Sequence, residues 1–214
     1  MIKVQKFTFG PFAENSYVLF DETNNCIIID PGCSNAQEEE LIANFISENK
    51  LNPVRLLNTH CHVDHVFGNH FIANKYNLEL EAHKLDIPTL NMVEMSVKMY
   101  GIPGYKKSPE ITVFLKHNET ITFGNSELKV LFTPGHAPGH IVFYNEPQHF
   151  VINGDVLFHL SVGRMDLPGG SEEVLRDTIK NVMYSLPDES VVFCGHGEET
   201  TIGFEKRNNP FIRI

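Results

Sequence analysis

The sequence has no long apolar run, few cysteines, no tryptophan and too few basic residues to balance its acidic ones. No stretch approaches the roughly 18 apolar residues that a membrane-spanning helix needs, so we expect no membrane partner. The start, MIKVQKFTFG, lacks the basic and apolar regions of a secretory signal peptide, which makes a cytoplasmic location the default expectation. Four cysteines in 214 residues are too few for a disulfide framework.

The charge balance narrows the class of partner. Seventeen Lys and Arg residues against 27 Asp and Glu residues give a formal net charge of −10. This balance argues against binding to nucleic acids or anionic membranes. Hydrophobic residues make up 42% of the chain, enough to bury a core. The length fits one domain, and we expect a single domain over residues 1–214.

Short apolar segments separated by turn residues occur in both halves of the chain. Strands are predicted for 2–9, 16–20, 26–30, 54–57, 78–82, 120–123, 128–132, 141–144, 150–153 and 191–194. Helices are predicted for 36–49, 66–76, 87–100 and 171–185. Segments 16–20 and 26–30 flank a turn and are expected to pair as a hairpin. This pattern predicts an α/β (α+β) protein with sheets packed face to face and helices outside.

One of these helices has an unusual composition. Met92, Met95 and Met99 lie near its apolar face within segment 87–100. Their helical spacing favours packing in the core, although methionines can also line an adaptable substrate pocket or a lid.

The eleven histidines are concentrated rather than scattered. Three histidines and one aspartate, His60, His62, Asp64 and His65, lie within six positions directly after the apolar segment 54–57. In a locally extended chain, His60 and His62 point to the same side and can share one ion. Asp64 and His65 lie further along and can reach a second ion. We know of no structural reason to bury such a cluster without a counter-ion, so it indicates a metal site.

Three later residues have a similar placement. His136, Asp155 and His196 each follow a predicted strand and have a glycine directly before them. Imidazole and carboxylate ligands suit zinc, iron or manganese. With the first cluster, these residues make seven candidate ligands, which divide into two sets of three and one shared carboxylate.

These residues resemble the metallo-β-lactamase superfamily of metallohydrolases. The HxHxDH motif at 60–65 is followed by His136, Asp155 and His196 in the family's order, and the resemblance covers nearly the whole chain. It implies a four-layer αββα sandwich with two divalent metal ions at one edge of the sheets. It further implies that His60, His62 and His136 hold the first metal, that Asp64, His65 and His196 hold the second, and that Asp155 bridges them. Zinc is the expected metal, with iron or manganese as alternatives.

Within that superfamily, the chain is most similar to the glyoxalase II (hydroxyacylglutathione hydrolase) group. The motifs that carry this similarity are 133–136 (TPGH), 154–158 (GDVLF), 163–164 (GR) and 194–198 (CGHGE). In that group a helical C-terminal domain follows the last metal histidine, whereas here 197–214 remain, so we expect that domain to be absent. Arg164 matches the family's basic residue for a glutathione carboxylate. Asp166 stands where the family has an aromatic residue.

The resemblance and the charges together predict a mechanism. Two divalent ions lower the pKa of bound water towards about 7, which supplies hydroxide at neutral pH. We expect a metal-bridging hydroxide to attack a thioester such as an S-acylglutathione, with Asp64 and Asp155 as catalytic metal ligands. Arg164 is expected to bind a carboxylate of an anionic small-molecule substrate. His140 is a candidate to support the ligands. As a group, the six histidines outside the candidate ligand set, which include His140, are expected to be solvated or to pack against other side chains.

Other functions stay open at this point. An iron-dependent persulfide dioxygenase would use His60, His136 and Asp155 as two histidines and a carboxylate on one iron. A lactonase or β-lactamase is a second enzymatic alternative. A metal-storage or metal-sensing protein is the non-enzymatic one, although a His/Asp-rich set with room for water favours catalysis. The sequence does not define the oligomeric state.

Overall fold

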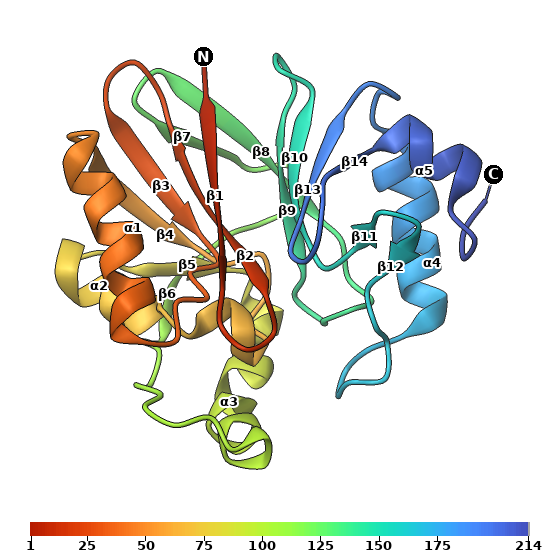
Figure 1. The fold of residues 1–214 in the computed structure, drawn as a ribbon. Helices are drawn as coiled ribbons and strands as arrows, with labels where there is room; N and C mark the ends of the chain where they lie inside the picture. The colour runs from red at the N-terminus through yellow and green to blue at the C-terminus, as the bar shows by residue number, and fades with distance from the viewer. Residues whose placement is uncertain (214) are drawn as a thin grey trace.

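The computed structural model describes residues 1–213 and contains two six-stranded sheets stacked face to face (Figure 1). The first sheet has the order β1 (Lys3–Phe9), β2 (Glu14–Phe20), β3 (Asn25–Ile29), β4 (Asn52–Leu57), β5 (Leu80–Ala82) and β6 (Ile111–Phe114). The second has the order β14 (Thr200–Thr201), β13 (Val191–Cys194), β10 (Phe150–Gly154), β9 (Ile141–Asn145), β8 (Ser126–Phe132) and β7 (Thr120–Phe123). A small separate hairpin pairs β11 (Leu157–Phe158) with β12 (Ser161–Val162).

Helices cover the outer face of each sheet (Figure 1). The α-helices are α1 (Ala36–Glu48), α2 (Asn69–Tyr76), α3 (Ile87–Tyr100), α4 (Glu172–Asn181) and α5 (Ile202–Asn208), with short 3₁₀ helices at Val63–Val66, Lys84–Asp86 and Met183–Ser185. Helices α1 and α2 lie against the first sheet and α4 and α5 against the second, while α3 projects at the lower end of the view. No helix among the described residues is long and apolar enough to cross a membrane.

The buried side chains form three clusters, one between each pair of neighbouring layers of helices and sheets. Strand β3 shows the reason, because its side chains alternate between the two faces of the sheet. Ile28 joins the cluster between the first sheet and its helices, whereas Ile27 and Ile29 join the cluster between the sheets. A third cluster fills the space between the second sheet and α4 and α5. The expected four-layer αββα sandwich is therefore confirmed.

Most predicted elements are present, with some differences at their ends. The predicted hairpin pairs β2 with β3, and all four cysteines are free and buried, as expected. The segment predicted as helix 66–76 begins as a 3₁₀ turn and becomes α-helical only from Asn69. The predicted helix 171–185 ends at Asn181, and a 3₁₀ turn follows it. Elements β6, β11, β12, β14 and α5 were not predicted from the sequence; β11, β12 and β14 have two residues each, too few to show a periodic pattern.

The topology brings several loops to one edge. Strand β10 pairs in parallel with β13, and β8 runs in the same direction because β9 lies antiparallel between β8 and β10. The carboxyl ends of these three strands therefore share an edge of the second sheet. In the first sheet, β3 and β4 are parallel and share an edge likewise.

Candidate metal centre

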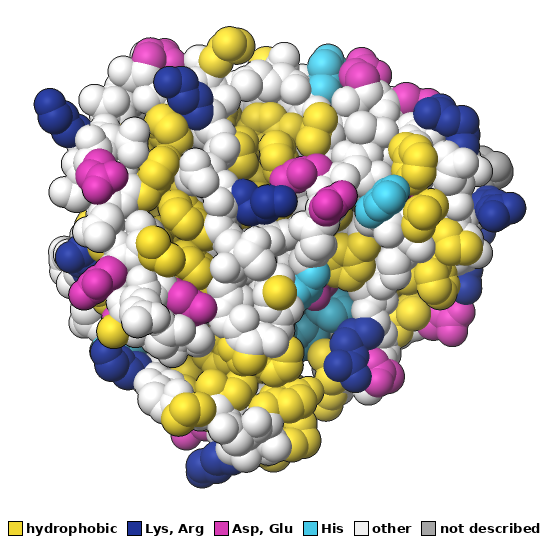
Figure 2. All heavy atoms as spheres, viewed as in Figure 1, with side chains coloured by type: hydrophobic (Ala, Val, Ile, Leu, Met, Phe, Trp, Pro, Cys, Tyr) yellow, Lys and Arg dark blue, Asp and Glu magenta, His cyan; other side chains and the backbone are white. Residues whose placement is uncertain are grey.

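All seven candidate ligands lie in the loops at these strand ends. The loop after β4 carries His60 and His62 and continues into the 3₁₀ turn with Asp64 and His65; His136 follows β8, Asp155 follows β10, and His196 follows β13. The histidines appear in the space-filling view as a group inside a hollow of the surface (Figure 2). The structure thus brings together all the residues that the sequence selected.

Asp30, at the end of β3, fixes the loop that carries the first cluster. Its Oδ1 accepts hydrogen bonds from the Thr59 backbone N–H (2.7 Å) and the Asn58 side chain (3.1 Å). Its Oδ2 accepts one from the Thr59 hydroxyl (2.6 Å) and lies 3.1 Å from Nδ1 of His65. From the sequence, this aspartate was expected only to end a strand. Its position directly after an apolar, fully buried run was the available signal, because a carboxylate buried there requires several donors.

Glycine permits the close approach of the last loop. A Cβ atom at Gly195 would lie 2.2 Å from Oδ1 of Asp155 and 2.9 Å from Cε1 of His65. A side chain at this position would therefore displace two candidate ligands. The backbone of Gly195 also donates to the carbonyl of Gly154 at 2.7 Å, which ties the loops after β13 and β10 together.

The candidate ligand atoms form two groups. In the first, Nε2 of His136 lies 2.8 Å from Nδ1 of His62 and 3.2 Å from Nε2 of His60. These three residues can offer nitrogen atoms that all lie within 4.8 Å of one another.

The second group consists of Asp64, His65 and His196. Nε2 of His196 lies 3.2 Å from Oδ2 of Asp64, and Nε2 of His65 lies 4.0 Å from the same oxygen. Asp155 lies between the groups: its Oδ1 is 3.4 Å from Nε2 of His65, and its Oδ2 is 3.5 Å from Nε2 of His136. The same Oδ2 is 3.5 Å from Nε2 of His196.

The hydrogen bonds behind the first group orient lone pairs toward its centre. Nδ1 of His136 lies 2.7 Å from the carbonyl oxygen of Arg164, which can only accept, so this nitrogen carries the proton. The Thr59 hydroxyl donates to Asp30 and therefore accepts from Nδ1 of His60 at 3.0 Å. Nε2 of each ring is then an unprotonated acceptor, and the two face each other. Such facing lone pairs fit a cation between them.

The second group follows the same logic. Nδ1 of His196 lies 3.1 Å from the carbonyl oxygen of Phe12, and Nδ1 of His65 bonds to the carboxylate of Asp30. In the neutral form of each ring, Nε2 would therefore direct a lone pair toward the carboxylates of Asp64 and Asp155. Among the described residues, none gives a hydrogen-bond partner to the buried Nε2 of His65 or Oδ1 of Asp155. This donor set of imidazole and carboxylate fits a divalent metal ion.

Burial and neighbouring charges shift the pKa values of the candidate ligands in different directions. Burial lowers the pKa of His60 well below its usual range and that of His62 to about 3, so both rings are neutral ligands at neutral pH. Burial raises the pKa of Asp155, but His65 and His136 outweigh it, and the net pKa is well below the ordinary value. Burial also lowers the pKa of His65, yet the carboxylates of Asp155 and Asp64 raise it well above the ordinary value. The electrostatic field at the His65 ring therefore favours a positive charge there.

His140 supports the centre from behind. Its ring is fully buried and stacks on that of His60, with centroids 4.8 Å apart. Its Nε2 accepts the backbone N–H of Asp155 at 3.1 Å, and its Nδ1 lies 3.0 Å from the Thr133 hydroxyl. This placement agrees with the supporting role suggested for His140. The other five histidines outside the candidate set are half-buried or exposed and belong to none of the metal-like groups: His70, His83, His117, His149 and His159.

A third group of possible ligand atoms lies close together but is held by hydrogen bonds within the protein. Asp30, His60 and His65 also lie near one another. The Asp30 carboxylate already accepts hydrogen bonds from Thr59 and from His65, so this group forms the support behind the ligands. Glu14 belongs to the same support, since its carboxyl lies 3.8 Å from Nδ1 of His65, and burial raises its pKa well above the ordinary value.

A cavity of about 660 Å³ opens directly above the candidate ligands. Met92, Met95 and Met99 line it and are here called the methionine wall. The expectation that these methionines pack in the core is wrong, because Met95 is 62% and Met99 69% exposed. The reason is that α3 buries its other face, where Val93 packs into the core under the first sheet.

Arg164 also lines this cavity, but its guanidinium already has a partner. Nε and Nη2 lie 2.7 and 2.8 Å from the two carboxylate oxygens of Asp166. Hydrogen bonding to the Arg164 side chain lowers the pKa of Asp166 to about 2. The residue expected to bind a substrate carboxylate is thus placed at the site and paired within the chain.

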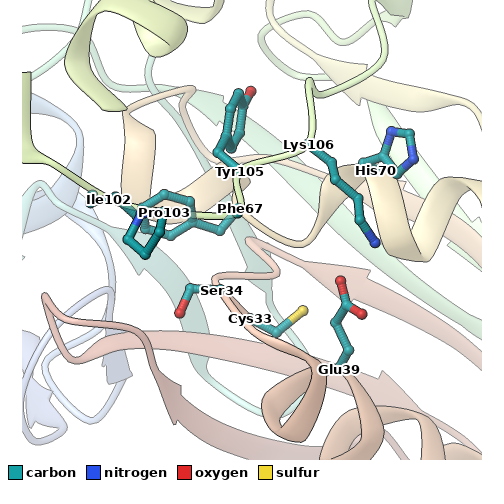
Figure 3. Close-up of a pocket in the computed structure, with 10 residues that line it drawn as sticks. Cys33, Ser34, Glu39, Phe67, His70, Ile102, Pro103, Tyr105 and Lys106 are labelled. Atoms are coloured by element: carbon teal, nitrogen blue, oxygen red, sulfur yellow. The ribbon is translucent and has the colours of Figure 1, made fainter. Parts of the chain in front are cut away.

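A second cavity lies outside the centre, under the loop that follows α3 (Figure 3). Its residues include Cys33, Phe67, His70 and Tyr105. Its volume of about 10 Å³ is enough for one water molecule at most. Burial raises the pKa of the Cys33 thiol far above the ordinary value, so this thiol is unreactive. The larger cavity is therefore the candidate site for a substrate.

Comparisons with known proteins agree with this geometry. The "Probable metallo-hydrolase YqgX" of Bacillus subtilis is 32% identical over 99% of this chain and 98% of its own. "Hydroxyacylglutathione hydrolase GloC" of Haemophilus influenzae is 33% identical over 94% of this chain and 93% of its own.

Solved structures give the same result. The crystal structure of "BLEG-1 B3 metallo-beta-lactamase" superposes with a TM-score of 0.89 at 31% identity, covering 99% of both chains. TTHA1623 "in a di-iron-bound form" gives a TM-score of 0.87 at 36% identity, covering 98% of this chain and all of the other. The family description "Metallo-beta-lactamase superfamily" matches residues 9–196. The chain therefore belongs to the metallo-beta-lactamase superfamily of metallo-hydrolases.

Proposed function

We propose that this protein is a binuclear metal-dependent hydrolase that cleaves a thioester, with an S-acylglutathione such as S-lactoylglutathione as the first candidate. One observation carries the proposal: two groups of imidazole and carboxylate ligand atoms, with Asp155 between them, lie under an open cavity of substrate size. The likeness to the Haemophilus influenzae hydroxyacylglutathione hydrolase supports the choice of thioester.

The ligands divide between the two metals as the hydrogen bonds suggest. His60, His62 and His136 would hold one ion, Asp64, His65 and His196 the other, and Asp155 would contact both. Bound there, two divalent ions would lower the pKa of a coordinated water towards about 7 and polarise a carbonyl group. Zinc is our first choice for both positions, and the di-iron-bound relative makes iron the main alternative.

The protein's own residues would perform three tasks. Asp64 is half-buried at the cavity floor, so one of its oxygens can orient the nucleophilic water while the other binds metal. Asp155 would hold the two metal positions at a fixed separation, since His140 and the loop after β10 fix its backbone. Arg164 is the candidate for a carboxylate of the thiol half, where a substrate carboxylate would replace Asp166.

The test is a thioesterase assay on the metal-loaded protein. We expect release of thiol from S-lactoylglutathione or another S-acylglutathione, and loss of both metal and turnover in Asp155→Ala. Full retention of activity in that variant would overturn the proposal.

A second candidate function has one specific observation in its favour. The BLEG-1 structure, at 31% identity, is that of a B3 metallo-beta-lactamase. The same metal centre could attack a β-lactam, so nitrocefin belongs in the same assay. Faster cleavage of nitrocefin than of any thioester would favour this second function.

A further inference from the structure

The cavity above the metal centre has an unusually apolar lining. Its floor is formed by His62, Asp64, Asp155 and His196. Its walls are mostly apolar: Phe12, Val63, Met92, Met95, Met99, Tyr100, Phe158, Val162, Leu167 and Pro168. In the space-filling view, hydrophobic side chains cover much of the surface around and below the histidines (Figure 2). Exposed apolar patches of this kind next to a reactive centre mark a ligand surface.

The base of the methionine wall packs against the rest of the protein. Leu90, Val93 and Val97 on the other face of α3 pack into the core under the first sheet. At the end of the helix, the ring of Tyr100 contacts that of Phe12 edge to face, with centroids 5.3 Å apart. The helix therefore presents its methionines to the cavity from a fixed position. Because methionine side chains are unbranched and polarisable, such a wall adapts to apolar groups of different length.

The charges of the cavity agree with an apolar group. Among the described residues that line it, Arg164 is the one Lys or Arg, and Asp166 occupies its guanidinium. The wall on α3 contributes, besides its methionines and Tyr100, only the small hydroxyl of Ser96. The polar groups on that wall are the hydroxyls of Ser96 and Tyr100, so the wall favours an apolar acyl group over the lactoyl group with which the thioesterase test begins.

We propose that the acyl half of the substrate is an apolar alkyl or aryl group, bound along the methionine wall. This inference rests on the proposed function for the reaction itself. In that function Arg164 takes a carboxylate of the thiol half, which leaves the methionine wall to the acyl half.

The first experiment varies the acyl length on one thiol. Acetyl, butyryl, hexanoyl and octanoyl glutathione are compared by kcat/KM on the metal-loaded protein. Burial of each added methylene is expected to raise kcat/KM by about threefold until the wall is covered. S-lactoylglutathione is expected to be slower than butyrylglutathione. Values that stay flat or fall with acyl length would overturn the inference.

Two variants connect the trend to the wall. Met95→Ser combined with Met99→Ser changes only exposed positions and is expected to lower the octanoyl-to-acetyl ratio of kcat/KM by about tenfold. The matched control is Leu41→Ser, an exposed apolar residue on α1, which is expected to leave the ratio unchanged. An unchanged ratio in the methionine variant would contradict the proposed binding surface.

A binding measurement separates this inference from the proposed reaction. Calorimetry with acetate, butyrate, hexanoate and octanoate on the metal-loaded protein is expected to show affinity that rises with chain length and falls in the methionine variant. If no thioester is hydrolysed but this binding trend holds, the proposed reaction fails and the acyl assignment stands. If octanoate binds no more tightly than acetate, the acyl assignment fails whatever the hydrolysis assay gives.

Discussion

The floor and the wall of the cavity are built in opposite ways. The floor is buried and polar, and its side chains are fixed by partners such as Asp30 and His140. The methionine wall is exposed and apolar, and its contacts within the protein are made by the other face of α3. Catalytic geometry requires fixed groups, whereas recognition of apolar groups tolerates adaptable ones. We infer that the floor determines whether the protein reacts at all and that the wall determines on what.

The largest expected effect comes from the residue between the two metal positions. Asp155→Ala removes the carboxylate that faces His65 and His136, so all substrates should lose activity together, by about 10³-fold or more in kcat/KM. Kinetics and metal analysis on the same sample test this. Asp177→Ala, an exposed aspartate on α4, is the control and should change neither quantity. A loss of kcat/KM in Asp155→Ala that is limited to substrates with long acyl groups would contradict the separate roles of the floor and the wall.

A smaller effect is expected from the support behind the floor. His140→Phe keeps a ring against His60 but removes the acceptor for the Asp155 backbone N–H. Losses of this kind of support typically cost about 10-fold to 100-fold in metal affinity or activity. Metal affinity measured by competition with a chelator distinguishes this role from packing alone. Equal metal affinity in variant and wild type would show that His140 only packs.

The ion pair at the edge of the wall should have a modest and selective effect. Asp166→Ala frees Arg164, and kcat/KM for an acidic thioester should rise by about twofold to fivefold, because an exposed ion pair competes only weakly with a substrate carboxylate. A thioester without carboxylates should respond much less. Adding Arg164→Ala to this variant should reverse the gain, and a gain that persists would exclude Arg164 as its cause.

A change outside both regions should affect stability without affecting activity. Burial raises the pKa of Asp21, but hydrogen bonds from Thr23, Asn125 and Ser126 outweigh it and leave the pKa below the ordinary 3.8. The stabilisation from this carboxylate is therefore present above pH ~4 and lost as the pH falls through the lowered pKa.

Asp21→Asn should accordingly lower the free energy of unfolding by about 1 kcal/mol at pH 7. Urea denaturation at several pH values tests this, and the difference from wild type should shrink in acid. An undiminished difference at low pH would contradict the role of the charge.

The floor could be predicted from the sequence, and the wall could not. Four of the seven candidate ligands lie within six positions, and the other three follow apolar strands, so local pattern alone selected them. The partners that fix them, Asp30 and Thr59, come from neighbouring strand ends and become visible only when β3 and β4 pair.

The methionines show why periodicity was insufficient. Both faces of α3 are apolar: helical spacing places Leu90, Val93 and Val97 on one face and the three methionines on the opposite one, but it does not show which face is covered. Which face is covered depends on where the 3₁₀ turns at Val63–Val66 and Lys84–Asp86 pack against α3. The pairing of Arg164 with Asp166 was likewise hidden, because two residues so close in sequence meet only when the backbone turns between them.

Anomalous diffraction at the absorption edges of zinc, iron and manganese tests the central claim most directly. Crystals of the purified protein should show two peaks, one among the nitrogens of His60, His62 and His136 and one among Asp64, His65 and His196, with Asp155 between them. A single peak, or a peak in the group of Asp30, His60 and His65, would contradict the binuclear centre.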